Sequence, residues 1–266
     1  MGRLAQLREE WRPSAVTLGR PAFPLFVLMG LNAVDELDRT AFAVLLPDIR
    51  DHFGLSNGAA LQLVALSTVA VILVEVPLSF WCDRRARVRI ATGGAALWGL
   101  FSAATGLATS LGALVASRLG AGVGRAVVNP THGSLLSDWY EPAARVKVFS
   151  LHRMANSIGQ FVGPAAAGVL AYYFGWRSPF ILFAIPTAVF VLLSLRLREP
   201  VRGRDERLAA GADEAEATVE RPPEGPIGTM RVLARIPTFR RIWAAVPFLG
   251  VALFGVPNLL SLIYEE

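Results

Sequence analysis

Charged and amide side chains recur at helical spacing inside apolar stretches of this 266-residue chain. In NAVDELDR, Asn32, Asp35 and Arg39 are spaced by three and four residues, and Asp38 follows Asp35 by three. This spacing places them on one face of a helix. A carboxylate there can bind a proton or a cationic group as a cavity opens and closes. The alternative is an intrahelical pair of Asp35 with Arg39, which would only lower the cost of burying both charges.

A second polar stripe runs through RLGAGVGRAVVNPTH, where the spacing is four, three, four and three. Its members are Arg118, Gly122, Arg125, Asn129 and His132. An arginine near the middle of an apolar helix is costly to bury, so we expect Arg125 to contact substrate or to take part in proton coupling. Pro130 lacks a backbone N–H and should loosen the helix one turn earlier.

A third stripe lies in a later apolar stretch and ends at a proline. It consists of Arg153, Asn156, Gln160 and Gly163, followed by Pro164. The stripe could face a substrate cavity. For Asn156 and Gln160 we favour a hydrogen-bonded seam between two helices, which requires no substrate.

The elements that must position these stripes are membrane-spanning helices. The chain is 53% hydrophobic and 18% charged, and its charges separate apolar runs of the length that crosses a bilayer. The sequence therefore predicts an all-α integral membrane protein. The expected spans are 24–46, 58–81, 90–108, 111–136, 148–174, 179–195 and 242–263. One cysteine permits neither an intrachain disulfide nor a cysteine-based metal site.

Charge and composition divide the chain into four regions. We expect a cytoplasmic N-terminal segment (1–23), a six-span bundle (24–196), a polar cytoplasmic linker (197–241) and a seventh span (242–266). If successive loops lie on alternate sides of the membrane, 20 of the 26 lysines and arginines fall on the side of the N-terminus and linker and two on the other. The other four lie within spans. The side of the N-terminus and linker is therefore expected to be cytoplasmic. Basic residues at span ends meet lipid headgroups, so the high net charge does not indicate nucleic-acid binding.

Three motifs resemble those of the major facilitator superfamily of transporters. SFWCDRRARVRI, between the second and third spans, is similar to the family's loop motif at Asp83, Arg84 and Arg87, although Ser79, Ala86 and Val88 depart from it. RLGAGVG is similar to the family's fourth-span motif, and GQFVGPAAAG to the fifth-span motif of its antiporters. The matching residues of these two helix-packing motifs are Arg118, Gly122, Gly124, Gly159, Gly163, Pro164 and Gly168.

The resemblance implies two three-helix repeats in a six-helix bundle, followed by a seventh helix that begins a second bundle. It implies secondary active transport of a small molecule, with proton-coupled export by alternating access as our first expectation. No cofactor, metal or enzymatic activity is expected. The implied partners are the substrate, protons, the lipid bilayer and a second six-span half beyond this sequence. The implied location is a cell membrane, by coding bias a bacterial one.

The resemblance also assigns expected roles to residues. Asp83, Arg84 and Arg87 are expected to form a cytoplasmic gate. Substrate and proton coupling are expected from the three polar stripes, at Asp35, Asp38, Arg39, Arg118, Arg125, Asn129, Arg153, Asn156 and Gln160.

LDRTAFAVLLPDIRDHFGLS further resembles the spinster-like branch of the family. Where that branch has a fourth-span glutamate, this chain has Arg125. A basic group at that depth suits an anionic substrate better than a spinster-like lipid. The alternative function is a membrane half-carrier that acts as a scaffold, or as the membrane part of an ATP-driven pump, although the chain has no phosphate-binding loop.

Overall fold

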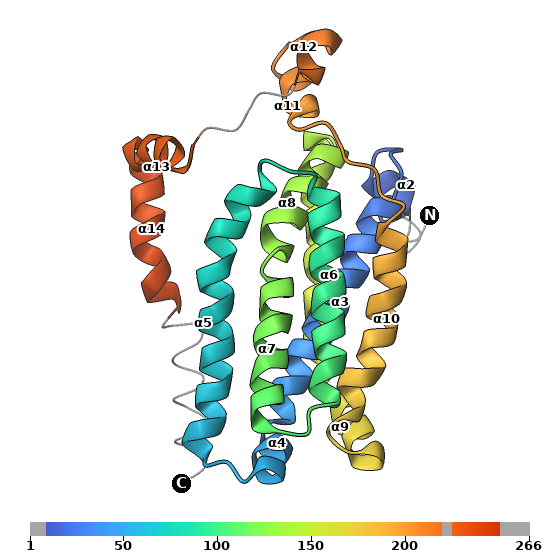
Figure 1. The fold of residues 1–266 in the computed structure, drawn as a ribbon. Helices are drawn as coiled ribbons and strands as arrows, with labels where there is room; N and C mark the ends of the chain where they lie inside the picture. The colour runs from blue at the N-terminus through green and yellow to red at the C-terminus, as the bar shows by residue number, and fades with distance from the viewer. Residues whose placement is uncertain (1–8, 220–224, 251–266) are drawn as a thin grey trace. The chain divides into compact units, whose positions relative to one another are not determined.

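The computed structural model describes residues 9–219 and 225–250, and the secondary structure within these ranges is helical. The chain divides into two compact units, residues 1–220 and 221–266. Long helices of the first unit run alongside one another (Figure 1). This arrangement agrees with the expected helical bundle.

Each of the first six expected spans corresponds to a helix or a pair of helices. These are α3 (Phe23–Val44), α5 (Asn57–Cys82), α6 (Arg87–Gly106), α7 (Leu111–Arg125) with α8 (Val128–Trp139), α9 (Pro142–Phe174) and α10 (Ser178–Ser194). Shorter helices flank them: α2 (Pro13–Val16), α4 (Leu46–Phe53), α11 (Arg204–Ala209) and α12 (Glu214–Thr218).

Local sequence explains where several of these helices begin and end. The hydroxyls of Ser56 and Ser110 each accept a hydrogen bond of 3.2 Å from the backbone three residues later, which caps α5 and α7. Prolines occupy the first turns of α3, α9 and α10, where no intrahelical N–H is needed. Gly54, with φ of 62°, ends α4 in the left-handed conformation that favours glycine.

The fourth span is interrupted between α7 and α8. The break falls at residues 126–127, one turn before Pro130, whose missing N–H leaves the carbonyl of Ala126 without its usual helical donor. The interruption matters for function because Arg125 is the last residue of α7 and Asn129 the second residue of α8.

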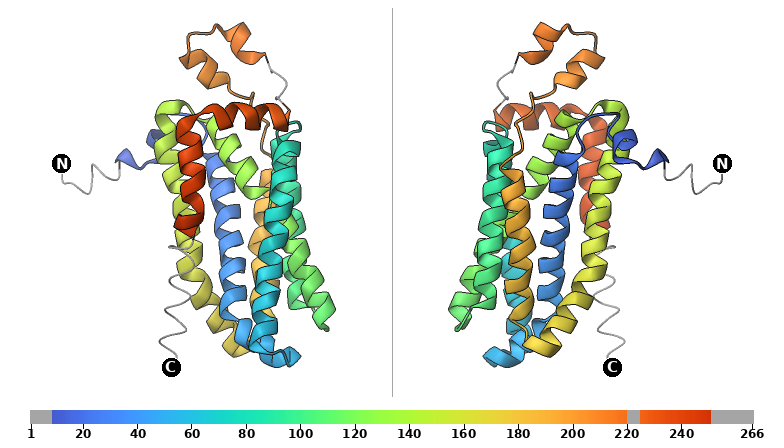
Figure 2. Two further views of the ribbon diagram at one scale, coloured as in Figure 1. Left: turned by 90° about the vertical axis from the view of Figure 1, so that its left-hand side faces the viewer. Right: turned by 90° about the vertical axis from the view of Figure 1, so that its right-hand side faces the viewer.

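Packing within the first unit is uneven. α3 packs against α9 and α10, while α6 packs against α7 and α10; Figure 2 shows α3 and α9 side by side. Large buried side chains fill these contacts, among them Trp98, Phe180, Leu28, Leu31 and Leu114. By contrast, α5 packs mainly against α7 and α8 and buries only Ala60, Leu63 and Cys82. Most of the apolar surface of α5 is therefore exposed.

Within the described ranges, two helical segments have both the length and the hydropathy of a membrane span. They are α5 and residues 111–139, the range that contains α7 and α8. α10 is apolar but shorter. α3 and α9 are long enough, but polar and charged side chains interrupt their apolar sequence.

The expected linker contains ordered helices, and its first part belongs to the first unit. The sequence places a boundary after residue 196, whereas the compact unit extends to residue 220. Hydrogen bonds from the segment that carries α11 to the span-joining loops explain the difference. The second unit contains α13 (Pro226–Arg235) and α14 (Pro237–Gly250). α14 covers the start of the expected seventh span, and residues 251–263 of that span lie outside the described residues.

Candidate functional site

Two carboxylates of α3 meet two arginines of α7 inside the first unit. The Nη2 of Arg125 donates to Asp38 over 2.8 Å, and its Nε donates to Asp35. Both terminal nitrogens of Arg118 lie 3.3 Å from the same oxygen of Asp38. Ser102 of α6 donates to the other oxygen. Asp38 is fully buried, so these donors replace the water that its charge would otherwise require.

Helical spacing explains how these side chains meet. Asp35 and Asp38 are three residues apart on α3, and Arg118 and Arg125 are seven apart, or two turns, on α7. The guanidinium of Arg118 lies 4.3 Å from the centre of the Phe42 ring, a distance at which a cation is attracted to the ring face. Thus the site combines ion pairs with an aromatic support.

A cavity of about 570 Å³ opens beside this network, with walls from α3, α5, α7, α8 and α9. This volume lies within the range of small-molecule sites. The ionisable groups on its wall are Asp35, Glu36, Arg39, Glu75, Arg118 and Arg125. Neutral polar groups on the wall include Asn32, Thr40, Ser67, Thr68, Asn129 and Asn156.

The intrahelical pair of Asp35 with Arg39, the alternative considered from the sequence, does not form. Arg39 instead pairs with Glu36, three residues before it, while Asp35 pairs with Arg125 of the neighbouring helix. The interpretation was wrong because it treated α3 in isolation. An arginine from α7 reaches Asp35, which leaves Arg39 to a glutamate that the sequence reasoning passed over.

Glu75 is the second carboxylate that sequence reasoning missed. It is the only acidic residue of α5, it is half-buried on the cavity wall, and it accepts a 3.0 Å hydrogen bond from the side chain of Asn129. A lone glutamate in a helix of 26 residues with otherwise apolar or neutral side chains is a recognisable signal of a functional position. Glu75 was missed because it belongs to none of the three polar stripes.

The first and third stripes meet only in part. Asn156 accepts a hydrogen bond from Asn32, which also donates to the backbone carbonyl of His152 over 3.0 Å. Arg153 and Gln160 are exposed and form no side-chain hydrogen bond within the described part of the chain. The structure therefore places Asn156 on the cavity wall, and Arg153 and Gln160 away from it.

His132 and His152 form a buried pair between α8 and α9. The Nδ1 of His132 lies 3.2 Å from the Nε2 of His152, so one ring donates to the other. His132 is 2% exposed and His152 8%. The partnership accounts for both polar rings in a packed region.

Four of the five helix-packing glycines lie at close contacts, whereas nothing stands within 4 Å of a Cβ added to Gly168. A Cβ on Gly124 would fall 2.5 Å from the backbone nitrogen of Trp98, and one on Gly159 would fall 2.6 Å from the Cβ of Glu36. Gly163 faces Thr40 with no room for a side chain, and Gly122 faces Val71. Pro164 lies inside α9, one residue after Gly163. Glycine thus lets α9 approach α3, and α7 approach α6, closely.

At the other end of the bundle, Arg87 forms the centre of a buried ion-pair cluster. It pairs with Asp138 at the end of α8 and, over 2.9 Å, with Glu199 after α10. Asp83 and Arg84 do not join this cluster through their side chains, which are exposed. The carbonyl of Asp83 accepts from Arg202. Among the three expected gate residues, Arg87 alone has a buried charge.

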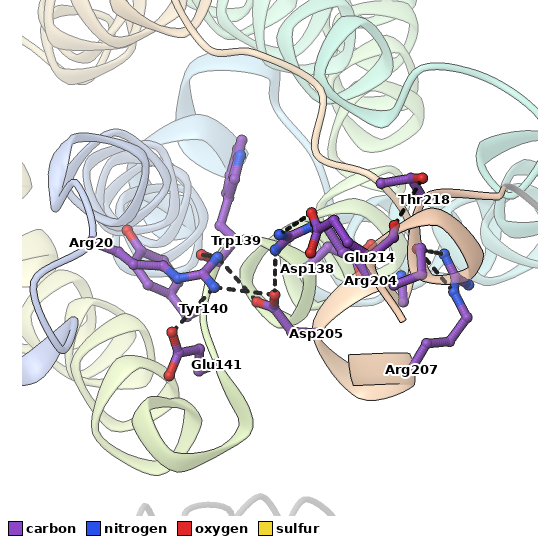
Figure 3. A network of polar contacts seen from close by, with 12 residues as sticks. Arg20, Asp138, Trp139, Tyr140, Glu141, Arg204, Asp205, Arg207, Glu214 and Thr218 are labelled. Atoms are coloured by element: carbon purple, nitrogen blue, oxygen red, sulfur yellow. Dashed lines mark hydrogen bonds and ion pairs between the residues drawn. The ribbon is translucent and has the colours of Figure 1, made fainter. Parts of the chain in front are cut away.

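A neighbouring network connects the N-terminal segment to the segment after α10, and Figure 3 shows it. Arg20 pairs with Asp205 over 3.0 Å and with Glu141 over 3.2 Å. Tyr140 is fully buried and donates to the carbonyl of Pro21 over 2.8 Å. Burial raises the pKa of Tyr140 to about 12, so its hydroxyl remains a donor at neutral pH.

The sequence is similar to those of several transporters. It is 26% identical over 161 residues to the probable L-galactonate transporter of Escherichia coli (strain K12), which is 60% of this chain and 36% of that protein. It is 27% identical over 250 residues to protein spinster homolog 1 of Homo sapiens, 91% of this chain and 45% of that protein. The chain thus spans about a third to just under half of these relatives' length.

The fold is similar to that of a solved transporter structure. A bacterial homolog of the human lysosomal transporter Spinster, in an inward-facing and unoccupied conformation, superposes with a TM-score of 0.62 at 25% identity. The match covers 68% of this chain and 44% of that one. The family model described as Major Facilitator Superfamily matches residues 28–266. The chain therefore belongs to the Major Facilitator Superfamily.

Proposed function

We propose that this chain supplies one half of a secondary transporter that moves a small organic anion together with protons. The observation that carries the proposal is the cavity of about 570 Å³ with arginines on its wall. In carriers of this kind, two bundles rock around a central site near the middle of the membrane. The first unit would supply one bundle, and a second six-helix bundle is the partner that the mechanism requires.

The arginines support an anionic substrate. Arg39 lines the cavity with 55% of its side chain exposed, so its guanidinium is accessible to a ligand. A planar guanidinium binds a carboxylate through two parallel hydrogen bonds, which neither a neutral nor a cationic substrate exploits. The relative from Escherichia coli is named for L-galactonate, a sugar acid with one carboxylate. We propose a sugar acid or a similar small carboxylate as the substrate class.

The carboxylates of α3 would couple binding to movement. Arg125 bridges Asp35 and Asp38, so a substrate carboxylate can take the place of Asp35 as its partner. That exchange would release Asp35 without exposing the buried pair of Asp38 with Arg118. Asn129 and Asn156 would supply neutral hydrogen bonds to the substrate from the same wall.

Transport by the complete protein in proteoliposomes tests this function, with radiolabelled L-galactonate as the probe. We expect acid outside the vesicles to drive uptake. Arg125→Ala should weaken binding roughly 10–100-fold, because a hydrogen bond to a charged group contributes about 1.5–3 kcal/mol. Arg12→Ala, on the exposed N-terminal segment, is the matched control. Equal uptake by the wild type and Arg125→Ala would contradict the proposed site.

A second candidate is proton-coupled export. Its support is the fifth-span motif of antiporters, whose glycines Gly159 and Gly163 bring α9 against α3 beside the cavity. The sign of the gradient separates the two directions. Export by antiport predicts that acid inside the vesicles drives accumulation, whereas co-transport predicts that acid outside does. The half-carrier alternative, serving an ATP-driven pump, predicts transport that needs ATP and ignores the pH gradient.

A further inference from the structure

We propose that Glu75 is the proton-binding group of the cavity, and that its protonation admits the anion. The inference rests on the proposed function and assigns the coupling proton to one side chain. Glu75 belongs to none of the three polar stripes and lies on α5, across the cavity from α3.

The site has one more carboxylate than guanidinium groups, and Glu75 is the carboxylate without a guanidinium partner. Four carboxylates and three arginines lie on or directly behind the wall: Asp35, Glu36, Asp38, Glu75, Arg39, Arg118 and Arg125. Arg39 pairs with Glu36, while Arg118 and Arg125 between them pair with Asp38 and Asp35. Within the described residues, no arginine, lysine or histidine lies within ion-pair distance of Glu75. The site therefore has one net negative charge until Glu75 binds a proton.

The surroundings of Glu75 leave its charge uncompensated but its oxygens accessible. Its Oε1 accepts from the Asn129 amide over 3.0 Å, and Oε2 has no hydrogen-bond partner in the part of the chain that the structure describes. A neutral amide stabilises either protonation state and cannot cancel the charge. Glu75 is therefore a half-buried carboxylate of the cavity wall that no guanidinium neutralises.

The titratable groups on the neighbouring elements are already engaged. On α7, Arg118 and Arg125 hold carboxylates of α3. On α8, His132 pairs with His152 of α9, and Asp138 pairs with Arg87 near the other end of the helix.

The remaining charged groups near α5 lie toward its two ends, and Arg84, just after α5, donates to the carbonyl of Phe80 over 3.1 Å. The charged residues of α4 pack near the first turn of α5, and Glu75 lies 18 residues, or about 27 Å, further along. At the opposite end, the only other titratable side chain of α5 is the buried Cys82.

Protonation of Glu75 and anion binding support each other. With Glu75 ionised, the net negative site repels an anion approaching Arg39 or Arg125. With Glu75 protonated, the three ionised carboxylates balance the three guanidiniums. A substrate carboxylate then brings the site to one net negative charge instead of two. Because linkage is reciprocal, a bound anion must favour the proton on Glu75 by the same factor.

The test compares Glu75→Gln and Glu75→Asp in the complete protein, with Glu10→Gln on the exposed N-terminal segment as the matched control. In proteoliposomes, the wild type should accumulate L-galactonate up to about tenfold across a gradient of one pH unit, if one proton moves with each anion. Glu75→Gln should exchange labelled for unlabelled L-galactonate without a gradient, yet accumulate none. Glu75→Asp should retain accumulation.

The outcomes separate this inference from the proposed function. No gradient-driven accumulation by the wild type would refute proton-coupled transport itself. Accumulation by Glu75→Gln equal to that of the wild type would overturn the role of Glu75 and leave the proposed function standing. Loss of exchange in Glu75→Gln calls for calorimetry in buffers of different ionisation enthalpy. Uptake of one proton per bound anion in the wild type and none in the variant supports the inference, and loss of binding in both Glu75 variants overturns it.

Discussion

At the scale of single residues, Asp38 depends on its neighbours to remain charged. Its carboxylate is fully buried and accepts hydrogen bonds from Ser102, Arg118 and Arg125. A buried charge without its partners is strongly destabilising, whereas the intact pair contributes little net stability. Asp38 therefore allows Arg118, which is 4% exposed, to remain charged in an apolar bundle.

The replacement Asp38→Asn tests this dependence. It leaves two guanidiniums facing an amide, and we expect the free energy of unfolding to fall by about 3–5 kcal/mol. Thermal unfolding of the purified protein in detergent measures the effect. The double variant Asp38→Asn with Arg118→Met should lose less than the sum of the two single variants, because it also removes the stranded charge. Additive losses would show that the two residues are not coupled.

Residue spacing predicted part of the site and missed another part. Asp35, Asp38, Arg118 and Arg125 were identified because spacings of three and seven place them on single helix faces, and the structure brings all four together. The sequence cannot show which face of α3 meets α7. The hydrogen bond from Ser102 to Asp38 and the pairing of Arg39 with Glu36 were missed for that reason.

At the scale of helices, glycine determines how closely α6 and α7 approach. Gly124 faces the backbone of Trp98 and Gly94, where an added Cβ would fall 2.5 Å and 2.7 Å from backbone atoms. Backbone atoms cannot move aside as a flexible side chain can. The resemblance to the family predicted small residues here, but only the structure identifies the surface that each glycine contacts.

Gly124→Ala should destabilise the protein by about 1–3 kcal/mol, the usual cost of overpacking a close contact. Gly133→Ala is the matched control. It also lies inside a helix, but nothing stands within 4 Å of its added Cβ, so it should be neutral or stabilising. Thermal unfolding in detergent compares the two. If both variants melt at the same temperature, the close contact contributes nothing to stability.

The helices of the polar linker could not be predicted from composition. Residues 197–219 read as a linker because they are rich in arginine, glutamate and alanine. Their order depends on tertiary partners that local sequence does not reveal. Arg202 donates to the carbonyls of Cys82, Asp83 and Arg85, and Glu199 pairs with the buried Arg87.

At the scale of the whole molecule, family membership implies an integral membrane protein. The distribution of basic residues predicts a cytoplasmic N-terminus and linker.

Single cysteines introduced in a Cys82→Ser background test this orientation. In right-side-out vesicles, an impermeant maleimide should label Asn57→Cys before lysis and Glu10→Cys only after it. Unmodified protein is the control, since Cys82 is 1% exposed. The reverse labelling pattern would invert the assigned orientation.

The contact between Arg20 and Asp205 has a consequence for how the protein is made. These residues are 185 positions apart, and the hydrogen bond between them spans all six helices of the bundle. At about 5–20 residues per second, a ribosome needs roughly 10–40 s to proceed from one to the other. During that interval Arg20 lacks its partner Asp205. The six helices can therefore pack against one another before this contact forms, and the synthesis of α11 completes the network around Arg20.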